Sequence, residues 1–275
     1  MVSEQEVTAL CAALKNWRQW AGDDMLHQLG VPKLDAAQKT KDYTQNFRRR
    51  LQIADRTSVD QLLEFFELGR FEQVTHIWSK PGFKLFISHV STAKDKLASL
   101  SENLEEYGII SFLAHEDIKP LDSWRDVLMK ALRSMDSLIS FHTEGFDQSS
   151  WCGQEVGIAM GLGIPVIPIM SGGVPTGFIS ALQAVKWNPE NPNETINVII
   201  RGIHANDAKA AVLAECLARK LKFSDSYDCS DRLVSSIRGC GSLSEQAKRS
   251  IDLALKFNDQ VRGRSNAMEL VSETV

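Results

Sequence analysis

Short apolar segments alternate with amphipathic ones between residues 83 and 187, and this alternation is typical of a parallel sheet with crossover helices. The apolar runs predict five strands, at Phe83 to Ile87, Ile109 to Leu113, Ser137 to Phe141, Pro165 to Ile169 and Ala184 to Trp187. The last run carries the weakest pattern. The spacing therefore predicts an α/β domain with a five-stranded parallel sheet and helices on both faces.

The predicted helices fall between these strands, at Thr92 to Glu106, Ser123 to Ser134 and Trp151 to Gly161, with a short helix after Thr176. The first helix ends at Tyr107-Gly108, where the glycine is a plausible C-cap. Its apolar stripe consists of Leu97, Leu100 and Leu104.

The flanks of this segment have helical patterns. Residues 1 to about 78 carry apolar side chains at helix-compatible spacing, and the turn signal at Ser79 to Gly82 ends them. After a turn-rich linker at Asn188 to Asn193, Lys209 to Leu221 and Ser244 to Asn258 form the clearest helices. We therefore expect three parts: a helical region over 1–80, an α/β domain over 81–190 and a second helical region over 191–275.

The charge of the chain excludes some partners. A formal net charge of −4 and a pI near 5.9 give no general attraction to nucleic acid or to an anionic membrane, so we expect neither as a partner. The span from Val156 to Val185 has no charged residue, but six glycines and three prolines divide it, and we interpret it as buried rather than membrane-spanning.

Cysteine spacing argues against structural bridges and metal. The five cysteines are scattered and never form a CxxC pair, so neither a disulfide framework nor a zinc ribbon is predicted. We therefore expect no metal site and a reducing compartment. No signal peptide is visible at the N-terminus, so we expect a cytoplasmic location.

Ligands of open parallel sheets bind beyond the carboxyl ends of the strands. The groups there are Ser88, His89 and Ser91 after the first strand, His115 to Asp117 after the second, and His142 to Ser150 after the third. The loop from Ser88 to Thr92 is neither a P-loop nor a GxGxxG turn, and it lacks the aspartate of a phospho-accepting receiver domain.

Glu155 is the most informative single residue. It stands near the start of a predicted helix, with Trp151 four positions earlier on the same face. One interpretation is that the carboxylate only complements the helix dipole. The other is that the helix delivers an anion and an indole into the crevice, where an oxocarbenium-like centre and a heteroaromatic base need such groups.

Five segments carry a resemblance to a known family: Phe86 to His89, Glu116 to Trp124, Trp151 to Glu155, Pro165 to Ile169 and Val185 to Trp187. Together they resemble the TIR (Toll/interleukin receptor) domain, of the bacterial NAD-consuming type, in which they correspond in this order to the first box, the BB loop, the WxxxE segment, the fourth strand and the closing signature. The resemblance covers about a hundred residues, and the flanks resemble no family.

The resemblance implies a flavodoxin-like fold and a function. Glu155 would be the catalytic carboxylate of an NAD⁺ glycohydrolase, with Trp151 as a wall of the same pocket. Ser88 and His89 would lie near the substrate, and Trp124 could stack on a base; we also expect Asp117, after the second strand, to contact the substrate. NAD⁺ is then the substrate, and no cofactor is required.

Simpler roles stay open for the supporting residues. Ser88 could serve close backbone packing, His89 could be a polar loop residue, Trp124 a hydrophobic staple and Trp187 a core residue. The sequence also departs from the family pattern, because no glycine follows Pro120 in the BB loop and no arginine follows the first strand.

NAD⁺ cleavage would release nicotinamide and give ADP-ribose or a cyclic product, since the sequence does not decide between water and an adenine nitrogen as the acceptor. The resemblance further implies self-association through TIR domains, a role in immune or anti-phage defence, and helical flanks that sense an activating ligand or build the oligomer. One alternative is a non-catalytic TIR adaptor that acts through homotypic contacts. Another is a ribosyl-transfer enzyme for nucleosides or signalling nucleotides.

Overall fold

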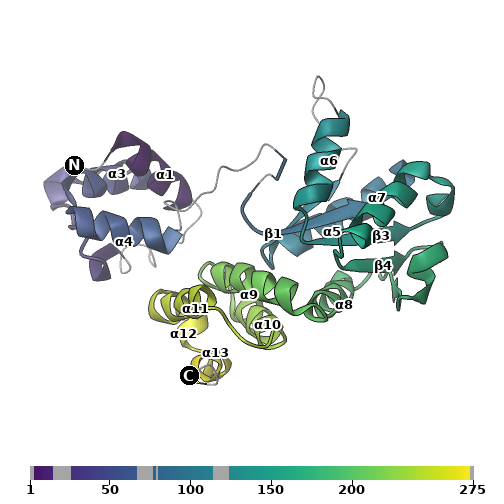
Figure 1. Ribbon diagram of the computed structural model, residues 1–275. Helices are drawn as coiled ribbons and strands as arrows, with labels where there is room; N and C mark the ends of the chain where they lie inside the picture. Colours follow the sequence, from purple (N-terminus) through teal and green to yellow (C-terminus); the bar gives the residue numbers. More distant parts are fainter. Residues whose placement is uncertain (1–2, 15–25, 67–76, 79, 114–123, 273–275) are drawn as a thin grey trace.

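A computed structural model describes residues 3–14, 26–66, 77–78, 80–113 and 124–272 of the chain. The centre of the molecule is a five-stranded parallel sheet with the order β2-β1-β3-β4-β5 (Figure 1). The strands are β1 (Phe83–Ser88), β2 (Ile109–Leu113), β3 (Ser137–His142), β4 (Val166–Met170) and β5 (Val185–Lys186).

This sheet confirms the predicted fold class, and each strand lies within one residue of its predicted bounds. β2 pairs with one edge of β1, whereas β3 pairs with the other edge and is followed by β4 and β5. The strand order therefore reverses between β1 and β3, and a crevice for ligands is expected beyond the carboxyl ends of these two strands.

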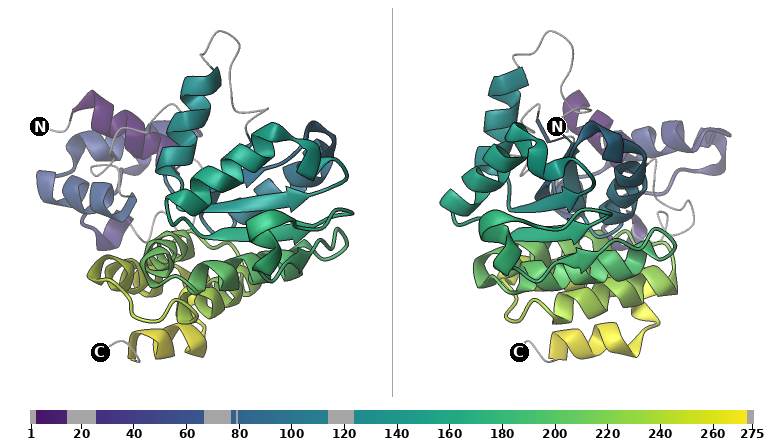
Figure 2. Two further views of the ribbon diagram at one scale, coloured as in Figure 1. Left: turned by 45° about the vertical axis from the view of Figure 1, so that its right-hand side comes forward. Right: turned by 90° about the vertical axis from the view of Figure 1, so that its right-hand side faces the viewer.

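Helices cover both faces of the sheet (Figure 2). The helices nearest to it are α5 (Lys94–Glu105), α6 (Trp124–Ser134), α7 (Ser150–Gly161) and α8 (Pro192–His204). A short 3₁₀ turn at Ser91–Ala93 precedes α5, and another at Gly177–Ala181 takes the place of the short helix expected after Thr176.

The two faces of the sheet have separate cores. Leu85 and Ile87 of β1 belong to the core on the side of α5 and α8, while Phe86 belongs to the core on the side of α6 and α7. Residues two apart on a strand share a face. Ser88 therefore lies on the α7 side of the sheet, like Phe86.

The C-terminal helices extend the first of these cores. They are α9 (Asp207–Leu221), α10 (Tyr227–Arg238), α11 (Glu245–Phe257), α12 (Asp259–Arg262) and α13 (Ser265–Ser272). Leu213, Leu233 and Ile251 from these helices share one buried cluster with strand residues. The predicted linker at 188–193 is shorter than expected, because α8 already begins at Pro192, where Asn191 caps the helix.

The N-terminal helices have their own apolar core. They are α1 (Glu4–Leu14), α3 (Tyr43–Ile53) and α4 (Arg56–Phe66), with a 3₁₀ turn at Ala36–Gln38. Helical regions thus precede and follow the strands along the chain, as predicted. The end of α4 meets the C-terminal helices, where the Phe65 and Phe257 ring centroids are 5.5 Å apart and Lys222 Nζ donates to the Phe65 carbonyl oxygen at 2.8 Å.

The uncharged span from Val156 to Val185 contains the end of α7, all of β4 and the turns that lead to β5. Within the described ranges, no helix has the length and apolar character needed to cross a membrane.

Candidate active site

The start of α7 places Glu155 against the sheet. Ser149 caps this helix by accepting a hydrogen bond from the Cys152 backbone N–H, which begins the helix at Ser150, one residue before the predicted start. Glu155 lies in the second turn, on the buried side with Cys152 and Val156, and is only 6% exposed. A carboxylate that served only the helix dipole would gain nothing from burial.

Ser88 at the end of β1 is the partner of this carboxylate. Its hydroxyl donates to Glu155 Oε2 at 2.6 Å, and Ser88 itself is 1% exposed. Burial raises the pKa of Glu155 to about 7, and the hydrogen bond from Ser88 opposes that rise. The site therefore holds a carboxyl group that changes charge near neutral pH.

Glu155 lies at a cleft of about 500 Å³ beyond the carboxyl end of β1. Trp124 and Trp151 stand on its sides, with ring centroids 4.6 Å apart in an edge-to-face arrangement. Both indoles are about two-fifths exposed, at 42% and 43%. The described lining residues are Ile87, His89, Val90, Ser91, Trp124, Leu128, Ser149, Trp151, Cys152 and Glu155.

The structure brings most of the predicted site residues together. Trp124, Trp151 and His89 line the cleft with Glu155, and Ser88 lies directly behind the carboxylate. His89 is 5% exposed, and its Nδ1 is 2.9 Å from the Ile87 carbonyl oxygen, to which the ring donates. Asp117 lies outside the described residues, as does the rest of the predicted BB loop before Trp124.

Four of the described lining residues were not predicted as site residues: Ile87, Val90, Leu128 and Cys152. Cys152 precedes Glu155 by one helical turn, so the same helical spacing that pairs Trp151 with Glu155 would have indicated it. Burial raises the pKa of its thiol. Ile87, Val90 and Leu128 carry no signal in the sequence that separates them from ordinary core residues, whereas Ser91 was predicted from its place after the first strand and does line the cleft.

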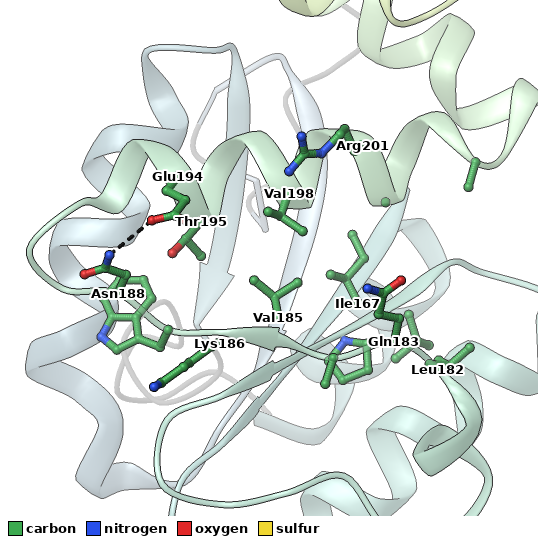
Figure 3. A pocket seen from close by; sticks show the side chains of 16 residues that line it. Ile167, Leu182, Gln183, Val185, Lys186, Asn188, Glu194, Thr195, Val198 and Arg201 are labelled. Carbon is green, nitrogen blue, oxygen red and sulfur yellow. Dashed lines mark hydrogen bonds between the residues drawn. The ribbon is translucent and has the colours of Figure 1, made fainter.

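A larger cavity of about 980 Å³ lies elsewhere, between α8 and strands β4 and β5 (Figure 3). Aliphatic side chains such as Val185 and Val198 line it, and Glu194 accepts a hydrogen bond from Asn188 at 3.1 Å. It does not adjoin the point where the strand order reverses. We assign the candidate site to the smaller cleft, because only there does a buried carboxylate meet a hydroxyl and two indoles.

Across the described part of the chain, no group of three or more histidine, cysteine, aspartate or glutamate side chains is arranged to hold a metal ion. The described residues of the cleft provide one carboxyl group, neighbouring hydroxyls, an imidazole, a thiol and aromatic faces. These groups suit a substrate with a flat ring and a reaction centre that becomes positively charged.

Comparisons with known proteins match the central part of the chain. The family model described as TIR domain matches residues 85–200, from β1 into α8. The solved TIR domain of the Toll-related receptor TRR-2 from Hydra magnipapillata aligns with a TM-score of 0.38 and 17% identity, over 43% of this chain and 96% of that chain. No curated protein matches the chain.

Proposed function

We propose that residues 85–200, which match the TIR domain family model, act as a TIR domain, and that this chain is an NAD⁺ glycohydrolase that uses Glu155 to cleave the bond between nicotinamide and ribose. The observation that carries the proposal is the Glu155 carboxyl group, buried at the cleft and hydrogen-bonded to Ser88 at 2.6 Å.

The leaving group explains why so few residues suffice. Nicotinamide in NAD⁺ is a cationic pyridinium, and when the N-glycosidic bond breaks it takes the bonding electron pair and leaves as a neutral molecule. No general acid is therefore needed. The positive charge moves onto the ribose, and the Glu155 carboxylate stabilises it in a site shielded from water.

The cationic substrate also favours the ionised form of Glu155, because a nearby positive charge lowers the pKa of a carboxyl group. Ser88 holds one carboxylate oxygen and fixes its direction, so Ser88 acts on the reaction through Glu155. Water then adds to the anomeric carbon and loses a proton, which gives ADP-ribose. Attack by an adenine nitrogen instead gives a cyclic product.

Trp151 and Trp124 would bind the nicotinamide ring and the neighbouring part of the substrate by stacking. Their edge-to-face arrangement presents two differently oriented indole surfaces at one cleft. His89 would complete the pocket wall beside them.

The test is nicotinamide release from NAD⁺ by the purified full chain. We expect turnover by the wild type and none by Glu155→Gln, which keeps the shape and the hydrogen-bond acceptor for Ser88 but removes the charge. Glu144→Gln is the matched control, because Glu144 is exposed on the loop after β3. A well-folded wild type that is self-associated and still releases no nicotinamide would refute the enzyme and leave the adaptor.

Self-association is the second part of the proposal. Phe178 is 88% exposed and Val174 is 62% exposed, both between β4 and β5, and such apolar side chains favour contacts with another protein. This surface is also the observation that favours a TIR adaptor. We propose that assembly through TIR domains activates the enzyme, in immune or anti-phage defence, with the helical flanks as sensors.

Assembly is tested by sedimentation together with the specific activity over a range of protein concentrations. The specific activity should rise as the protein associates. Full activity in a dilute, demonstrably monomeric sample would contradict the requirement for assembly without affecting the assignment of Glu155.

A further inference from the structure

The charges around the cleft raise a question about the rest of the substrate. Among its described lining residues the cleft contains one carboxylate, Glu155, and neither lysine nor arginine. A dinucleotide carries two phosphate charges next to the ribose that Glu155 would hold. Like charges repel most strongly where water is excluded, so the diphosphate must point away from Glu155, toward the mouth of the cleft.

Arg125 is a cation at this mouth. It follows Trp124 at the start of α6, and its guanidinium carbon is 5.7 Å from the centroid of the Trp124 ring. Trp124 in turn contacts Trp151, and both residues line the cleft. Stacking on an indole positions a guanidinium without neutralising its charge and leaves its N–H edge available.

The charge of Arg125 is not otherwise used. Arg125 is exposed, and within the described ranges it makes no hydrogen bond and no ion pair. Lys96, near the start of α5, differs in this respect, because its Nζ donates to Ser171 Oγ at 3.1 Å. Arg125 is thus an exposed cation next to Trp124, one of the residues that line the cleft.

We infer that Arg125 binds the diphosphate of the substrate and makes the cleft selective for a phosphate-bearing dinucleotide over a free nucleoside. The inference rests on the proposed function. The planar guanidinium forms paired hydrogen bonds with phosphate oxygens, and its place beside Trp124 directs the phosphates outward while the nicotinamide ribose stays at Glu155. It also supplies the cation that the sequence lacks directly after β1.

The experiment compares NAD⁺ with nicotinamide riboside, which has the same scissile bond and no phosphate, in the wild type, Arg125→Ala and Arg125→Lys. Arg125→Ala should lower kcat/KM for NAD⁺ about tenfold or more, the usual effect of losing a charge-assisted hydrogen bond. It should leave kcat/KM for the riboside within twofold. Arg125→Lys should restore part of the loss, because it keeps the charge but not the planar fork.

Arg133→Ala is the matched control, because Arg133 is an exposed arginine at the other end of the same helix. It should behave like the wild type with both substrates. Calorimetric binding of ADP-ribose by the wild type and Arg125→Ala provides a readout that does not need turnover, and the alanine variant should bind about tenfold or more weakly.

The outcomes separate the two proposals. If the wild type releases nicotinamide from neither NAD⁺ nor the riboside, the proposed glycohydrolase function is wrong, whatever the affinity for ADP-ribose. Equal affinity of the wild type and Arg125→Ala for ADP-ribose overturns the role of Arg125, and so does an equal loss of activity toward NAD⁺ and the riboside, since that pattern reports a structural defect at Trp124.

Discussion

Replacing Glu155 by glutamine should make the protein more stable at alkaline pH. The carboxyl group is buried, so the folded state keeps it protonated up to a pKa of about 7, whereas an unfolded chain ionises it near 4.5. A group whose pKa is raised by folding contributes its full stability below the unfolded value and loses it as the pH rises toward the folded value. Above pH 7 the folded protein therefore holds an unfavourable buried charge.

The size of the effect follows from the two pKa values. One unit of pKa corresponds to about 1.4 kcal/mol, so the rise from 4.5 to about 7 amounts to about 3 kcal/mol at pH 8.5. Glutamine carries no charge, and its amide oxygen can still accept the Ser88 hydrogen bond. We expect Glu155→Gln to raise the free energy of unfolding by about 3 kcal/mol at pH 8.5 and by less than about 1 kcal/mol at pH 4.5.

Thermal unfolding across this pH range is the measurement. For a chain of this size about 3 kcal/mol corresponds to a shift in Tm of about 5 °C. Glu144→Gln, which removes an exposed carboxylate, should have the same Tm as the wild type at every pH. A gap between Glu155→Gln and the wild type that stays constant from pH 4.5 to 8.5 would refute the reasoning, because a pH-independent gap cannot come from the titration of this carboxyl group.

Two further substitutions test the site and the fold. Ser88→Ala removes the hydrogen-bond donor that lowers the pKa of Glu155. The rising limb of the pH profile of kcat/KM for nicotinamide release should therefore move to higher pH. An unchanged profile would argue against a role of Ser88 in setting the charge of Glu155. Gly108→Ala places a Cβ 2.9 Å from the Cys216 carbonyl oxygen at a residue with φ of 69°; we expect a loss of at least about 2 kcal/mol in chemical denaturation. At Gly145, where φ is 87°, an added Cβ meets no atom within 4 Å, so Gly145→Ala should lower the free energy of unfolding by less. Equal losses for the two variants would show that the contact between Gly108 and α9 is unimportant.

The strands and the main helices of the central domain were predictable because their signals are local. A strand buried on both faces carries apolar side chains at successive positions, as at Leu85 to Ile87 and at Leu138 and Ile139, and turn residues mark its ends. The start of α7 was visible within one residue for the same reason. The helix α8 was partly missed, because asparagine and proline at Asn191 and Pro192 favour both a turn and a helix N-terminus.

The chemistry of the site depended on tertiary structure. Nothing in the sequence around Glu155 states that its carboxylate is buried, that Ser88 donates to it from 67 positions away, or that its pKa lies near 7. Trp124 likewise lines the cleft only because α6 packs beside α7 on the same face of the sheet. The sequence by itself determined which residues form strands and helices, since backbone conformation follows from side chains nearby in the chain. Only the packing of those elements decided which polar groups share a cleft, because burial and electrostatic coupling act through space between segments that the sequence keeps far apart.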